Sequence, residues 1–141
     1  MSMPEFKTIL NPRRELLAAV ANPARRLDYL VTIARRLNLQ TAARPVQLTM
    51  RDSPDLWILD QPSVPDYMRA LEETGWNNLE TLARTVLDDF SNELVTRWVE
   101  VSLRDHENGS AGTNFDYGIT MEDRQPSWSN PQLLSRVKPS L

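Results

Sequence analysis

The chain has 141 residues, 40% of them hydrophobic and 25% charged, a composition that suits one globular domain with a core of useful size. It contains no cysteine and a single histidine, which excludes disulfides, thiolate metal ligands, cysteine nucleophiles and a histidine-rich metal site within one chain. No apolar run approaches the roughly 20 residues that span a bilayer, and no secretory signal is recognisable. We therefore expect a cytoplasmic protein that does not contact membranes.

The net charge of −3 is distributed unevenly along the chain. Residues 1–44 carry eight basic and three acidic residues, a net +5, whereas the remainder carries eight basic and sixteen acidic residues, a net −8. A basic segment of this kind is one feature of nucleic-acid binding. However, consecutive arginines in a strand point to opposite faces, which dilutes any single basic patch. We therefore favour opposite charges meeting within the fold or between subunits, and we expect no nucleic-acid partner.

Residues 1–26 are predicted to form an N-terminal extension. Two Asn-Pro dipeptides, at 11–12 and 22–23, are turn signals, and the stretch between them favours one or two helical turns. Residues 27–121 are predicted to form a single domain, and residues 122–141 an irregular C-terminal tail.

Two strands are predicted at the start of this domain. Residues 27–37 alternate β-forming side chains with a period of two, and residues 45–51 alternate apolar and polar side chains more cleanly. The apolar residues 56–59 are expected to continue the second strand after a bend at 53–55.

Two helices are predicted to follow. The first lies within 61–75, with Ser63 as its N-cap and Gly75 at its end. In the second, which begins at Asn77, apolar residues recur at steps of three and four as far as Leu94 and form a stripe typical of a core-facing helix. Four acidic residues on these helices are expected to face solvent: Glu72, Glu73, Asp88 and Asp89.

The last two predicted strands form a hairpin. Residues 97–104 and 114–122 both alternate with a period of two, and a turn is expected between them at 107–112. The order is therefore ββααββ, which predicts an α+β fold whose four-stranded antiparallel sheet carries two helices on one face. Three side chains on the last strand are large for an edge and favour assembly of the chain with itself: Phe115, Tyr117 and Met121.

The same order resembles the tunnelling fold (T-fold), in which ββααββ units assemble around a central tunnel. Within that superfamily the chain resembles the NADPH-dependent nitrile reductases that convert 7-cyano-7-deazaguanine to its aminomethyl form in queuosine synthesis. The resemblance spans about residues 21–118 and is carried by short fragments in the family's order: "ANPARRLDYLVTI", "RDSPD", "ETLARTVLDDF", "RWVEV" and "NFDYG". It implies a homo-oligomer that binds a small heterocycle.

The sequence departs from the family at the residues that perform its reaction. The nucleophilic cysteine of the family falls near Leu37, and its acidic proton donor falls near Arg44. The lysine-rich cofactor stretch falls on "DQPSVPDYM", which contains no lysine, and no glycine-rich nucleotide loop is present. NADPH is therefore implied by the resemblance alone, and we predict no catalytic residue, no metal and no other cofactor.

Glu80 is the strongest candidate for a binding residue, and two interpretations of it stay open. In the T-fold, a glutamate near the start of the second helix accepts two N–H groups of a purine or pterin, and a carboxylate has the two coplanar acceptors for this. Alternatively, Asn77 and Glu80 form a capping box, in which the glutamate binds the N-cap N–H. Trp76 and Asn77 precede the glutamate and are the other candidates for the pocket.

The sequence thus supports two hypotheses of function. The first is a protein that binds a purine- or pterin-like heterocycle and resembles the nitrile reductases without their reductase chemistry. The second is a non-catalytic structural or interaction protein that uses the T-fold as an assembly platform.

Overall fold

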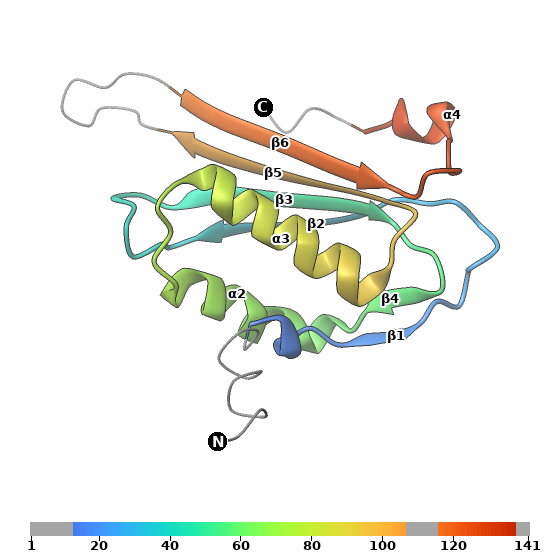
Figure 1. Cartoon of the computed structure of the whole chain (residues 1–141), viewed down its shortest axis with the longest axis horizontal. Helices are drawn as coiled ribbons and strands as arrows, with labels where there is room; N and C mark the ends of the chain where they lie inside the picture. Colours follow the sequence, from blue (N-terminus) through green and yellow to red (C-terminus); the bar gives the residue numbers. More distant parts are fainter. Residues whose placement is uncertain (1–12, 107–115, 138–141) are drawn as a thin grey trace.

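The computed structural model describes residues 13–106 and 116–137, which contain two antiparallel sheets (Figure 1). The four-stranded sheet has the order β2-β3-β5-β6 and the two-stranded sheet the order β1-β4. The six strands are β1 (Ala19–Ala21), β2 (Val31–Leu37), β3 (Val46–Ser53), β4 (Trp57–Leu59), β5 (Trp98–His106) and β6 (Asp116–Arg124). The helical elements are η1 (Arg14–Leu16), η2 (Gln61–Ser63), α2 (Val64–Glu73), α3 (Leu79–Leu94) and α4 (Pro131–Leu134).

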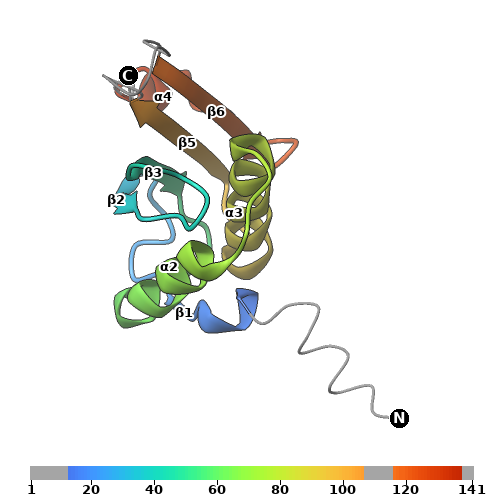
Figure 2. The same ribbon diagram turned by 90° about the vertical axis from the view of Figure 1, so that its left-hand side faces the viewer.

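Both long helices, α2 and α3, lie on the same side of the four-stranded sheet, as the end-on view in Figure 2 shows. The predicted α+β class and the antiparallel four-stranded sheet are therefore confirmed. None of the helices in the described part of the chain is long and apolar enough to cross a membrane.

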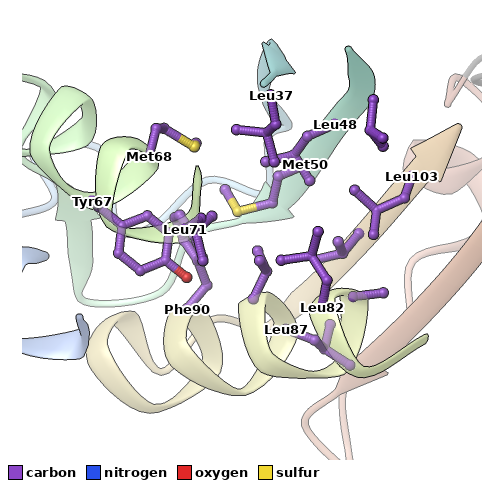
Figure 3. Close-up of a cluster of buried hydrophobic side chains, with 14 of the residues drawn as sticks. Leu37, Leu48, Met50, Tyr67, Met68, Leu71, Leu82, Leu87, Phe90 and Leu103 are labelled. Atoms are coloured by element: carbon purple, nitrogen blue, oxygen red, sulfur yellow. The ribbon is translucent and has the colours of Figure 1, made fainter. Parts of the chain in front are cut away.

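The core forms between the sheet and the helices because the strands alternate as the sequence predicted. Leu48 and Met50 of β3 lie opposite Leu103 and Val101 of β5, and all four side chains are at most 1% exposed. Figure 3 shows the side chains of α2 and α3 that pack against this face. Tyr67 and Phe90 meet there edge to face, with their ring centroids 5.5 Å apart.

The opposite face of the sheet is polar. Arg51 and Glu100 lie directly opposite each other and form an ion pair of 2.8 Å, and Ser102 shares a hydrogen bond of 3.0 Å with Thr120. Cross-strand pairs of this kind stabilise a sheet face that is not covered by helices.

The prediction that residues 56–59 extend the second strand is wrong. They form β4, which pairs with β1 from the N-terminal segment in a separate sheet. Asn22 fixes this arrangement, because its backbone N–H donates to the carbonyl of Leu56 and its side chain donates to the carbonyl of Asp55. A period-two pattern identifies a strand but not its partner, and the partner here lies more than 30 residues away.

Other element boundaries differ by a few residues. β2 begins at Val31 rather than at residue 27, and β6 continues to Arg124. The N-terminal segment forms one short 3-10 turn and then a strand, and the tail contains the short helix α4. The predicted turn at 107–112 and the side chain of Phe115 lie outside the described residues.

Opposite charges from the two halves of the chain meet within the fold. Arg13 contacts Asp89 at 2.6 Å, and Arg35 lies 3.9 Å from Glu72. The Arg13 contact corrects the prediction that Asp89 faces solvent, since the residue is 4% exposed and also accepts a hydrogen bond of 2.7 Å from the Tyr67 hydroxyl. The expectation that Glu72 faces solvent is corrected as well, because its side chain is only 17% exposed and also accepts a hydrogen bond from the backbone N–H of Asn38.

Candidate ligand site at the start of α3

The N-cap of α3 is Asn78, not Asn77. Asn78 has an extended backbone, and its side-chain oxygen accepts hydrogen bonds from the backbone N–H of Thr81 at 2.8 Å and from the Thr81 hydroxyl at 2.7 Å. With Asn78 as the N-cap, Glu80 is the second residue of the helix. The capping-box interpretation of Asn77 and Glu80 is therefore wrong, because the third helical residue is a threonine.

Glu80 instead interacts with β6. The hydroxyl of Tyr117 donates to its carboxylate at 2.5 Å. This hydrogen bond, and a second one from the backbone N–H of Glu80 itself, lower the pKa of the Glu80 carboxyl, and the same contact raises the pKa of Tyr117. Glu80 is exposed, so its carboxylate is an ionised acceptor at the surface, in the first turn of a helix where negative charge is favoured.

Trp76 and Asn77 line a cavity of about 420 Å³ beside this helix start. The indole N–H of Trp76 donates to the carbonyl of Leu71 at 2.8 Å, which fixes the ring at the end of α2. Asn78 and Leu79 also line the cavity, and Glu80 follows directly in the chain without being part of the lining. Trp76 and Asn77 thus line one cavity, whereas the exposed Glu80 lies outside its lining and contacts Tyr117 of β6.

The sequence fragments that were compared above with the nitrile reductases contain residues that form hydrogen bonds with one another. Arg97 donates to the carboxylates of Asp28 and Asp55 at 3.2 and 3.3 Å, and to backbone carbonyls of residues 25 and 27. The Tyr29 hydroxyl donates to the side chain of Asn22 at 2.8 Å. This network joins the residues that precede β2, β4 and β5, so these side chains are structural.

The structure adds two roles to those expected from the sequence: Asp52 is buried beside a cavity, and Tyr117 is the partner of Glu80. Asp52 follows Leu48 and Met50 at steps of two, so the alternation itself assigns it to the apolar face of the sheet. Tyr117 was assigned to assembly, and the sequence holds no signal that pairs it with Glu80, because the contact spans 37 residues.

No cluster of three or more metal-ligating side chains occurs among the residues that the structure describes. Comparison with protein-family models gave no match for this chain. Comparison with curated proteins gave no match either.

Proposed function

We propose that the protein binds a planar nitrogen heterocycle of the purine or pterin kind through Glu80, with Trp76 and Asn77 in the adjoining cavity. The observation that carries the proposal is that Asn78 makes the helix cap, so the Glu80 carboxylate is not needed for it. An ionised carboxylate has about four lone-pair sites, and the Tyr117 hydroxyl and the backbone N–H of Glu80 together leave room for a pair of ligand N–H donors.

The proposal includes the tunnelling fold and homo-oligomerisation. The order ββααββ with the spatial order β2-β3-β5-β6 supports this architecture. The proposal excludes nitrile reduction through a thioimide, because that step needs a thiolate and the chain has no cysteine.

The variant Glu80→Gln tests the binding role. Glutamine replaces one of the two acceptors with an NH₂ donor, which would face a ligand donor and leave both groups unpaired. We expect affinity for a guanine-like or pterin-like ligand to fall about ten- to more than a hundredfold, the equivalent of roughly 1.5–3 kcal/mol for a charged hydrogen bond. Calorimetric titration of both proteins with a small panel of such heterocycles measures this.

Thermal unfolding of the free variant should be nearly unchanged, because Glu80 is exposed and Asn78 makes the cap. Glu73→Gln, an exposed glutamate on the neighbouring helix, is the matched control and should bind like the wild type. Equal binding by wild type and Glu80→Gln, or no binding of any heterocycle by the wild type, would refute the role of Glu80.

A second function, an assembly platform, is favoured by the charges on the two edge strands. Within the described residues, β2 and β6 each pair on one side only. β2 carries Arg35 and Arg36 and no acid, whereas β6 carries three acidic residues and one arginine. Edges of opposite charge suit head-to-tail pairing of β2 with β6 of the next copy, which closes into a ring when the rotation permits.

Light scattering tests this pairing. We expect the wild type to have a mass of at least twice the monomer's 16.2 kDa at micromolar concentration. Arg36→Glu should shift the mass toward the monomer, because it places a like charge opposite the acidic edge. Arg84→Glu, on the exposed face of α3, should leave the mass unchanged. A monomeric wild type would remove the assembly-platform function.

A further inference from the structure

A second cavity lies between β2, an edge strand of the described sheet, the strand β4 and the start of α2. Its volume is about 530 Å³. Its walls are mainly apolar and include Val31, Ile33, Ile58, Leu59 and Val64. It shares no lining residue with the cavity beside Trp76, whose walls come from the segment between β2 and β3, from residues 76–79 and from Asp105.

Asp52 is the one charged residue among the described residues that line this cavity. Its side chain belongs to the helix-facing side of β3, and its register neighbours on the adjacent strands are Val31 and Val99. The residue is only 4% exposed, and no described residue donates a hydrogen bond to its carboxylate. Burial alone raises the pKa of Asp52 from 3.8 to about 7.

Asp89 shows how unusual this arrangement is within the same fold. Asp89 is also 4% exposed, but Arg13 donates to it at 2.6 and 3.2 Å and the Tyr67 hydroxyl donates at 2.7 Å. Buried carboxylates are normally paired in this way, since an unpaired one is costly. Asp52 is as buried as Asp89, but no described residue pairs with its carboxylate. It borders the cavity, which has room for a partner.

We propose that this cavity binds a small organic cation, whose ammonium or amidinium group pairs with the Asp52 carboxylate while its apolar body packs on the valine, isoleucine and leucine walls. A cation supplies the charge and the N–H donors that the carboxylate lacks. A single positive charge suffices, because the described walls hold no other charged side chain. An amidinium fits well, since its two parallel N–H groups match the two carboxylate oxygens.

Benzamidine and benzamide test the proposal. The two molecules have nearly the same shape, but benzamidine is a cation with paired N–H donors and benzamide is neutral. By calorimetric titration at pH 8, we expect the wild type to bind benzamidine at least tenfold more tightly than benzamide. Asp52→Asn should remove this preference. Asp123→Asn should retain it, because Asp123 lies in the same row of the sheet but is exposed and outside the cavity.

The location of binding provides a test that needs no variant. Benzamidine should shift the NMR signals of Val31, Ile33 and Ile58 and leave those of Trp76 unchanged. Glu80→Gln should bind benzamidine like the wild type, so this inference and the heterocycle site fail independently. The proposal would be overturned if benzamidine still bound to Asp52→Asn as it binds to the wild type, or if the wild type bound benzamide as tightly as benzamidine. It would also be overturned if the wild type bound neither benzamidine nor the bulkier amine tryptamine.

Discussion

Replacing Asp89 by alanine should lower the free energy of unfolding by about 3–5 kcal/mol, the usual cost of removing one partner from a buried ion pair. Asp89 accepts from two donors that come from different parts of the chain, Arg13 before β1 and Tyr67 on α2. Burial and the neighbouring Asp89 raise the pKa of Tyr67 well above its usual value, so its hydroxyl remains a proton donor and needs an acceptor. In the described structure this fully buried hydroxyl donates to Asp89, so removing the carboxylate removes the acceptor that it uses.

Urea denaturation of the wild type and Asp89→Ala measures the loss. Asp88→Ala is the matched control, because Asp88 is the preceding residue on the same helix, has a side chain that is 51% exposed and, among the described residues, pairs only with Arg84. An exposed pair of this kind contributes about 0.3–0.5 kcal/mol.

A double-mutant cycle separates the contribution of the Tyr67 hydroxyl to the free energy of unfolding from the other contacts of Asp89. In a Tyr67→Phe background no hydroxyl is left without an acceptor, so Asp89→Ala should cost less than it does in the wild type. Equal costs for Asp88→Ala and Asp89→Ala would contradict this description of the cluster.

Replacing Asp52 by asparagine should stabilise the protein increasingly as the pH rises. The pKa of the Asp52 carboxyl is 3.8 in an ordinary environment and about 7 in the folded protein, because burial disfavours its charged form. Below about pH 4 it is protonated in both the folded and the unfolded chain. Between about pH 4 and 7 the unfolded chain releases the proton and the folded protein keeps it, so folded-state stability falls with rising pH.

The size of this effect follows from the difference in pKa. At about 1.4 kcal/mol per pH unit, the loss reaches roughly 4 kcal/mol near pH 7 and then levels off. Asparagine does not titrate, so the stability of Asp52→Asn relative to the wild type should increase by about this amount between pH 4 and pH 8.

Denaturation of both proteins, freed of small molecules, at a series of pH values measures the difference. The other titrating groups contribute nearly equally to both proteins and cancel. A difference that is constant from pH 4 to pH 8, or a variant that loses stability relative to the wild type as the pH rises, would contradict the burial of an unpaired carboxyl at this position.

The elements of this fold could be predicted where a pattern is local. The period-two alternation of β3 and β5 and the apolar stripe of α3 each identify an element and its buried face without knowledge of its partner. The pairing of β4 with β1 could not be predicted in this way. It depends on the contact of Asn22 with residues 55 and 56, which no local pattern encodes.

The candidate site and the buried Asp89 were predicted less completely, each for its own reason. Asn77 and Asn78 are adjacent and chemically identical, so the sequence did not reveal which one caps α3, and a shift of one residue changed the role of Glu80. Asp89 looked like its exposed neighbour Asp88, although it lies three residues after Val86 and seven after Leu82, both of which are buried. The helical spacing therefore indicates that Asp89 is buried. Its contacts with Arg13 and Tyr67 are long-range and follow from no local pattern.

The central claim, that Glu80 holds a heterocycle, is tested most directly by identifying the small molecules that the protein retains. Wild type and Glu80→Gln would be purified in parallel under native conditions and denatured, and the released molecules measured by mass spectrometry. We predict a purine- or pterin-like heterocycle in the wild-type sample, at least tenfold depleted in the sample from Glu80→Gln. Release of no such molecule from the wild type, or of equal amounts from both proteins, would contradict the claim.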